Sequence, residues 1–316
     1  MTAADHSATH PERPRFGGWR GTPLRIVVVI ALFAGLGIAL RGSWSRLGEI
    51  DWQLNPLAVA GAFAAMLIAS TWAAFAWLFV ARAFGARLAL RPALRIYMTS
   101  NLGKYLPGKV LHAVARVYLV QQQGVPFAVA STGVAVDVLL HVAAALSIVA
   151  LAVPTVVGTV ADLDATLVTA IAACGTLVGF GLLHPRSLNA AFSIARRLLP
   201  TREFPPVTVG YATILRAFSL YLGLWALYAV GLYGCAAAVY PVDWTAVPLL
   251  GAGYALAYLV GTVVAILPAG AVVREGILTL VLAQVMPAPA ALATSVLVRL
   301  VQMAAEGVCA AVCSRF

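Results

Sequence analysis

Residues 99–124 read TSNLGKYLPGKVLHAVARVYLVQQQG and form a polar, basic stretch inside a chain that is 62% hydrophobic and 10% charged. The helix-breaking tripeptide Leu106-Pro107-Gly108 lies among four basic or titratable side chains, Lys104, Lys109, His112 and Arg116. A charge at bilayer depth is unfavourable by several kcal/mol unless it faces a cavity, a partner or a ligand. We therefore expect this stretch to meet a negatively charged group inside a membrane.

Long apolar runs on both sides of this stretch indicate a membrane protein. The mean hydropathy is +0.94, and runs of about 17–25 apolar residues let a helix cross the ~30 Å hydrocarbon core. The sequence predicts an all-α polytopic membrane protein with one or two re-entrant or broken helices and about eight transmembrane helices, at 24–40, 56–80, 126–152, 164–183, 210–239, 245–267, 272–287 and 291–313. The seventh starts with Arg274-Glu275, so a half-helix is the alternative there.

The distribution of arginine predicts the orientation of the chain. Residues 1–23 are expected to be a disordered cytoplasmic tail, and 24–313 a single transmembrane domain. Arginines gather in the tail, near 82–95 and in loop 184–209, which also contains an amphipathic helix, Leu188–Leu199. Because basic residues favour the cytoplasmic side, both termini and this loop are predicted to be cytoplasmic in a cell (plasma) membrane protein. The net charge of +10 is then mainly an orientation signal and not a sign of nucleic-acid binding.

The segment 93–123 is too polar to span and too apolar for a free loop. Pro107-Gly108 divides it into two halves, and non-helical backbone at membrane depth is tolerated where it is buried or lines a wet cavity. We predict a re-entrant segment; a surface amphipathic hairpin is the alternative. A second break, LPAGAVVREG at 267–276, repeats the order Leu-Pro, Gly, Val, Arg. Interrupted segments in both halves of a membrane chain point to a substrate site and to an internal repeat.

Both breaks resemble motifs of a known family. Residues 101–109, NLGKYLPGK, followed by Arg116 and Gly124, are similar to the N-x-x-K-Y-x-P-G-x…R…G signature of the lysylphosphatidylglycerol synthase transmembrane region family. The later P-G-G-x-G-x-R-E block of that family resembles Pro268, Gly270, Arg274 and Glu275, although Ala269, Ala271 and Val272 or Val273 stand near positions usually taken by glycine. The resemblance covers about 24–313.

The resemblance implies a lipid-handling membrane module. In the best-known members this module is the flippase half of a two-part protein, and it moves a lipid that a separate cytoplasmic aminoacyl transferase domain makes. No segment of this sequence is expected to form that transferase domain. Some stand-alone members carry names that suggest glycosyl transfer to polyprenyl lipids, which keeps an enzymatic alternative open.

Further polar residues lie within predicted spans. Asp137 and His141 are four apart on one helix face and can hydrogen-bond, which allows either a proton relay or a structural ion pair of Asp137 with Arg116 or Lys109. Arg299, Gln302 and Glu306 form one stripe of the last span, and Arg299 can pair with Glu306 or Glu275. Four cysteines, at 174, 235, 309 and 313, are interpreted as small buried hydrophobes.

These residues lead to a hypothesis of function. The chain is predicted to be a lipid transporter or flippase that binds an anionic phospho- or polyprenyl-phosphate headgroup, with no cofactor, no metal and no catalytic residue. The candidate headgroup-binding residues are Asn101, Lys104, Tyr105, Pro107, Gly108, Lys109, Arg116, Arg274, Glu275 and Arg299, with Asp137, His141, Gln302 and Glu306 as intramembrane polar partners. The alternatives are a transferase acting on a polyprenyl-phosphate lipid and a non-catalytic partner of a lipid-modifying enzyme.

Overall fold

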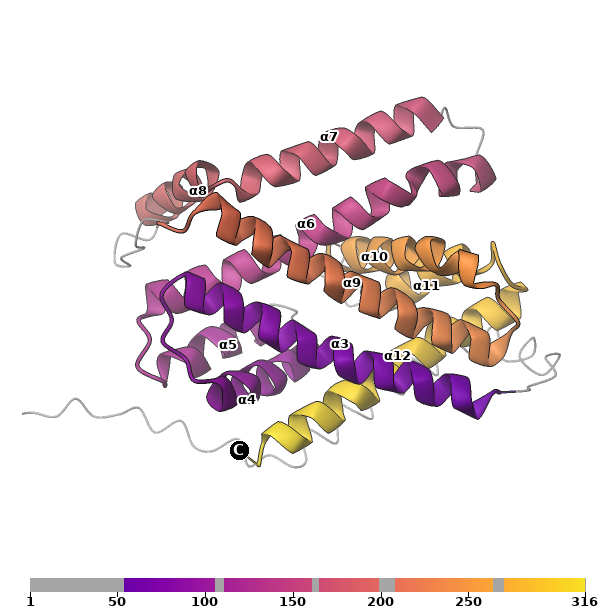
Figure 1. The fold of residues 1–316 in the computed structure, drawn as a ribbon, viewed down its shortest axis with the longest axis horizontal. Helices are drawn as coiled ribbons and strands as arrows, with labels where there is room; N and C mark the ends of the chain where they lie inside the picture. Colours follow the sequence, from indigo (N-terminus) through magenta and orange to yellow (C-terminus); the bar gives the residue numbers. More distant parts are fainter. Residues whose placement is uncertain (1–53, 106–110, 161–164, 199–207, 264–269, 316) are drawn as a thin grey trace, which may run out of the picture. The chain divides into compact units, whose positions relative to one another are not determined.

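The computed structural model describes residues 54–105, 111–160, 165–198, 208–263 and 270–315. Within these ranges the chain is helical and contains no strand (Figure 1). The helices are α3 (Pro56–Ala83), α4 (Leu90–Asn101), η1 (Leu102–Tyr105), α5 (Leu111–Gln121), α6 (Phe127–Val160), α7 (Ala165–Leu183), α8 (Pro185–Leu198), α9 (Tyr211–Val239), η2 (Trp244–Ala246), α10 (Val247–Val263), α11 (Gly270–Leu282) and α12 (Ala288–Cys313), of which η1 and η2 are short 3-10 helices.

Five segments of the described chain are long and apolar enough to cross a membrane. They are Pro56–Ala83, Phe127–Ala152, Tyr211–Val239, Trp244–Thr262 and Ala288–Cys313. Each overlaps a span that the sequence predicted, so a multipass helical membrane protein is confirmed, whereas the count of about eight spans is not. The predicted first span, 24–40, lies outside the described residues, as does the predicted tail, 1–23.

The predicted seventh span, 272–287, is shorter in the structure than the sequence suggested. The helix there, α11, has 13 residues. At 1.5 Å per residue it is about 20 Å long, which is less than the hydrocarbon core of ~30 Å. The described helix is too short to cross the core by itself, and the half-helix stays a prediction. Pro268, in the break before it, lies outside the described residues.

Helices α3 and α9 pack closely along their lengths (Figure 1). They are antiparallel, since the backbone N–H of Asn55, the N-cap of α3, donates to the carbonyl of Ala238 near the end of α9 at 3.0 Å. A Cβ atom added at Gly234 of α9 would lie 2.9 Å from the Cβ of Ala62 in α3. Small residues allow membrane helices to approach in this way. The pair supports the helices that carry the polar residues, because α4, α6 and α12 all pack on α3.

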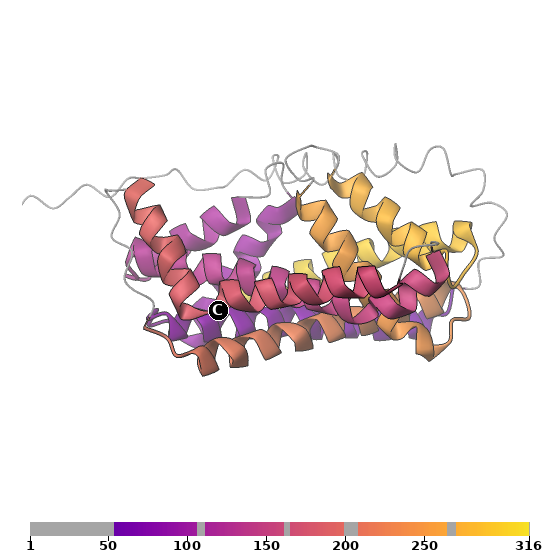
Figure 2. The ribbon, with the colours of Figure 1, turned by 90° about the horizontal axis from the view of Figure 1, so that it is seen from above.

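The predicted break segment 93–123 forms two short helices, α4 with η1 and then α5, which pack against each other. A Cβ atom added at Gly103 in η1 would lie 3.1 Å from the Cα of His112 in α5, so glycine permits this close approach. In Figure 2, α4 and α5 (purple) and α11 (gold) lie on the same side of α9. Pro107, Gly108 and Lys109 lie outside the described residues, and the re-entrant placement of the segment stays a prediction.

Loop 184–209 contains the amphipathic helix that the sequence predicted, as α8, which packs on α7. Leu188 is buried, whereas Ile194 and Arg197 on the helix are exposed. Apolar and basic groups on one exposed helix are typical of a segment that lies at a membrane surface. The cytoplasmic side of this loop stays a prediction.

Candidate functional site

Glu306 of α12 is the centre of a hydrogen-bonded network. Its side chain is 3% exposed, and the ammonium of Lys104 lies 2.6 Å from its Oε1 atom. The hydroxyl of Tyr105 donates to Oε2 at 2.9 Å, and the amide of Gln302, one helical turn earlier, donates to Oε1 at 3.1 Å. Buried carboxylates need such donors. The carboxylate thereby attaches η1, at the end of the first break, to the last helix.

Gln302 extends this network to the second break. Its Oε1 atom accepts from the hydroxyl of Tyr254 in α10 at 2.7 Å and from Nη2 of Arg274 in α11 at 3.2 Å. The same Nη2 also donates to the Tyr254 hydroxyl at 2.8 Å, and the guanidinium lies 5.0 Å from the centre of the Tyr254 ring. Lys104 and Arg274, which are 170 positions apart in the chain, therefore meet at two neighbouring side chains of α12.

A second polar cluster surrounds Arg116 of α5. Its Nη1 atom lies 2.7 Å from Oδ2 of Asp137 in α6, and its Nε atom donates to the hydroxyl of Ser100 at 3.2 Å. The other carboxylate oxygen of Asp137 accepts from the hydroxyl of Tyr221 in α9. The guanidinium also stacks 4.1 Å from the centre of the Tyr97 ring. Arg116 is thus one of the two partners that the sequence proposed for Asp137, and its guanidinium is buried among Asp137, Ser100 and Tyr97.

The described charges of these clusters are not balanced. Arg299 pairs with Glu275 at 2.7 Å, which is one of the two pairings that the sequence allowed. Lys104 and Arg116 each pair with a carboxylate as well, and Arg274 is a fourth cation. The clusters therefore contain four cations and three carboxylates. Arg274 differs from the other three cations, because the acceptors of its hydrogen bonds are the neutral Tyr254 and Gln302, although its charge also interacts with Glu275 and Glu306. The described residues of these clusters therefore carry one positive charge in excess.

His141 lies in an aromatic group and not against Asp137. Its ring centre is 4.8 Å from that of Tyr258 and 5.2 Å from that of Trp225, and the indole N–H of Trp225 donates to the His141 carbonyl at 3.2 Å. Among the described residues no hydrogen bond joins His141 to Asp137, whose oxygens are taken by Arg116 and Tyr221. The predicted contact between the two is therefore not present, because partners from other helices satisfy the carboxylate.

The structure brings together some of the predicted site residues and separates others. Lys104, Tyr105, Arg274, Gln302 and Glu306 share one network. Glu275 and Arg299 pair with each other. Asn101 ends α4 and is half-buried next to η1, while Pro107, Gly108 and Lys109 lie outside the described residues.

Three tyrosines that lie in the site were not proposed from the sequence as site residues. They are Tyr97, Tyr221 and Tyr254, and each contacts a charged group of the site. The sequence signal that could have identified them is a tyrosine in or next to an apolar helix. A buried tyrosine hydroxyl usually finds a hydrogen-bond partner, so such a residue is a candidate contact of a buried charge.

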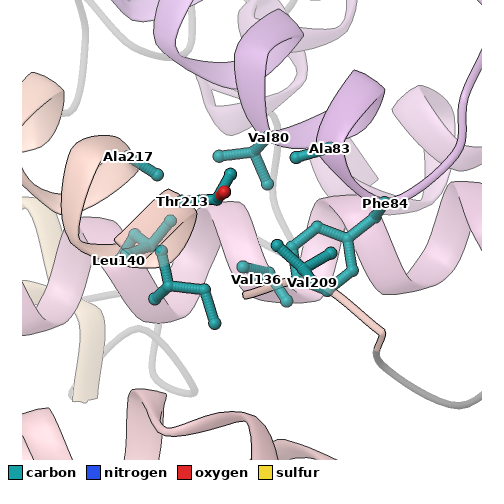
Figure 3. Close-up of a pocket in the computed structure, with 9 residues that line it drawn as sticks. Val80, Ala83, Phe84, Val136, Leu140, Val209, Thr213 and Ala217 are labelled. Atoms are coloured by element: carbon teal, nitrogen blue, oxygen red, sulfur yellow. The ribbon is translucent and has the colours of Figure 1, made fainter. Parts of the chain in front are cut away.

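A separate apolar pocket lies between α3, α6 and α9 (Figure 3). Its cavity volume is about 10 Å³, close to the space that one water molecule needs. Thr213 is the single hydroxyl-bearing residue among its lining side chains, which include Val80, Phe84, Val136 and Leu140. The pocket is too small and too apolar for a lipid headgroup. The candidate headgroup site is therefore the network around Glu306 and Arg274.

Comparison with known proteins identifies the region to which this network belongs. The model of the family described as lysylphosphatidylglycerol synthase TM region matches residues 23–306. The match includes both breaks, the Arg116 cluster and the whole network from Lys104 to Glu306. No curated protein matches the chain.

Proposed function

Since the chain belongs to the lysylphosphatidylglycerol synthase TM region family, a family of lipid-handling membrane proteins, we propose that it binds an anionic lipid headgroup within the membrane and carries it between leaflets. The lipid would be a phospholipid or a polyprenyl phosphate. The chain would act as a transporter or flippase, in the plasma membrane, with both termini cytoplasmic. A lipid-modifying enzyme would be a natural partner.

One observation carries this proposal: Lys104 and Arg274 reach the same buried network from the two breaks, and the network has one positive charge in excess. A phosphate offers several oxygens, and charge-assisted hydrogen bonds are roughly twice as strong as neutral ones. The guanidinium of Arg274 donates from Nη2 and keeps Nε and Nη1 for a ligand, since both known contacts use Nη2. Two cations on separate elements can therefore hold one headgroup.

Arg116 is assigned a structural role in this proposal, although the sequence placed it among the headgroup-binding residues. Its side chain is 3% exposed and its donors already face Asp137 and Ser100. A ligand would have to displace a buried carboxylate and leave it unpaired, which is strongly unfavourable. Lys104, with 26% of its side chain exposed, is the more accessible cation.

The experiment is a lipid-scrambling assay on the purified full chain. Vesicles of phosphatidylcholine with a trace of fluorescent phosphatidylglycerol are treated with an impermeant quencher, and the protected fraction reports movement between leaflets. Wild-type protein should lower the protected fraction below that of empty vesicles. Arg274→Gln should weaken phosphatidylglycerol binding about tenfold or more, because a hydrogen bond to a charged group contributes ~1.5–3 kcal/mol.

A matched control removes the same charge elsewhere. Arg87 is exposed between α3 and α4, so Arg87→Gln should leave binding unchanged. Equal protected fractions in wild-type and empty vesicles would refute transport. Equal phosphatidylglycerol affinity of Arg274→Gln and wild-type protein would refute the proposed site.

A further inference from the structure

The ion pair with Glu306 reduces the affinity of Lys104 for an anionic headgroup, because the carboxylate already neutralises the ammonium. The two charged atoms are 2.6 Å apart, and the carboxylate has two more donors, Tyr105 and Gln302. Exposure is unequal, since 26% of the lysine side chain is accessible but only 3% of the glutamate side chain. A ligand would therefore approach the lysine from its open side, and the glutamate would stay behind in the protein.

An anionic headgroup that binds Lys104 removes the cation that neutralises the carboxylate of Glu306. The carboxylate would keep the hydroxyl of Tyr105 and the amide of Gln302, both neutral, but would lose its cation. A buried carboxylate without a cation is strongly unfavourable in its ionised form and is stabilised by protonation. The headgroup phosphate would also repel it.

From this geometry we infer that Glu306 is an internal counter-ion, which an anionic headgroup displaces from Lys104 and which takes up one proton from water when displaced. The inference rests on the proposed function and deepens it, because it makes the proton a second ligand of the same site. The proton comes from a hydronium ion or a protonated buffer molecule, whose bond to hydrogen breaks, and it forms a new O–H bond on a carboxylate oxygen. The carboxylate anion thereby becomes a neutral acid, and no other covalent bond changes.

The surroundings of Glu306 contain one further cation and several hydroxyls. The titratable groups that interact with it are Lys104 and Tyr105 of η1, Tyr97 of α4, Tyr228 of α9, Tyr254 of α10, Arg274 of α11 and Cys309 of its own helix. The one charged residue of α3, which also packs on α12, is Arg82, and its guanidinium donates to the carbonyl of Leu88. Arg299 of α12 interacts with Lys104 and is paired with Glu275. Arg274 is the cation that remains, and in the proposed complex it donates to the same headgroup.

Proton uptake on binding fixes the sign of the pH dependence. The complex holds one proton more than the free protein, so acid favours binding and alkali opposes it. For a single coupled proton, affinity changes by up to about tenfold per pH unit. Removal of the carboxylate should abolish this dependence.

The test uses purified full-length protein and short-chain phosphatidylglycerol as the probe, with short-chain phosphatidylcholine as the neutral reference. Wild-type protein should bind phosphatidylglycerol more tightly as pH is lowered from about 8 to about 5, by up to tenfold per unit. Glu306→Gln keeps the size of the side chain, and its amide can accept from Gln302 and donate to the hydroxyl of Tyr105. This variant should bind tightly at every pH. Asp243→Asn removes an exposed carboxylate that caps η2 outside the network, and it should retain the wild-type pH dependence.

Calorimetry on the wild-type protein provides a measurement that needs no variant. In two zwitterionic buffers of different ionisation enthalpy, the binding heats should differ by an amount that corresponds to net proton uptake of up to about one proton per headgroup bound. Binding of phosphatidylglycerol without proton uptake and with constant affinity would overturn this inference and leave the proposed function intact. Failure of wild-type and Glu306→Gln protein to bind at any pH would overturn both.

Discussion

The buried pair of Arg116 and Asp137 should control the stability of the described helices. Arg116→Gln leaves Asp137 with the hydroxyl of Tyr221 alone, and Asp137→Asn leaves the guanidinium without an anion. The exposed fractions of the two side chains are 3% and 10%, so each single change removes a partner in a nearly water-free environment. Breaking a buried pair from one side is destabilising by about 3–5 kcal/mol.

The two single changes are not equivalent in detail. Arg116→Gln also removes the stacking on Tyr97 at 4.1 Å, which contributes up to about 2 kcal/mol when desolvated. We therefore place Arg116→Gln at the upper end of the range and Asp137→Asn lower. The double variant leaves no buried charge, and its free energy of unfolding should exceed the additive expectation by about 2–3 kcal/mol, the upper part of the range for residues in contact.

The assay is unfolding of the four proteins in mixed detergent micelles with increasing dodecyl sulfate, followed by tryptophan fluorescence. The exposed Arg87→Gln serves as a reference and should change stability by less than about 0.5 kcal/mol. Strict additivity of the single changes would refute the reasoning, because it would mean that the two side chains do not sense each other. A double variant that regains stability but loses phosphatidylglycerol binding would instead return Arg116 to the headgroup site.

Two other predictions concern packing and orientation. Gly234→Ala should destabilise the protein by about 1–3 kcal/mol in the same assay, because its Cβ would lie 2.9 Å from Ala62, whereas Gly61→Ala meets no atom within 4 Å and should be tolerated; equal effects would show that α3 and α9 do not pack this closely. In a variant without native cysteines, a cysteine at the exposed Ala190 of α8 should escape an impermeant label added to intact cells, and one at the exposed Thr245 should react. External labelling at Ala190 would reverse the predicted orientation.

The bounds of a helix could be predicted from the sequence where a long apolar run determines them. They could not be predicted where contacts with neighbouring elements determine the length of the helix. The last span was placed at 291–313 and the structure has α12 at Ala288–Cys313, because an apolar run this long has few alternatives in a membrane. The helix α11 was harder to predict, since 13 residues that begin at a glycine after a break do not determine their own length from hydropathy.

The same contrast applies to the site. The pairing of Asp137 with Arg116 was accessible from sequence, because a charge in an apolar span requires a partner and few cations were available. The contact of Lys104 with Glu306 was not, since the two residues are 202 positions apart and each was assigned to a different group. Periodicity places side chains on a face of one helix, but it does not indicate which other helix that face meets.

The amide of Gln302 gives the network a direction. Its carbonyl end receives hydrogen bonds from Tyr254 and Arg274, and its amino end donates to Glu306. A half-turn of this amide would set N–H groups against a guanidinium and an oxygen against a carboxylate, so both ends oppose the rotation. If Glu306 becomes neutral, one of these two constraints disappears. The charge state of Glu306 can then be transmitted to Arg274, in the helix after the second break, by the rotation of the Gln302 amide.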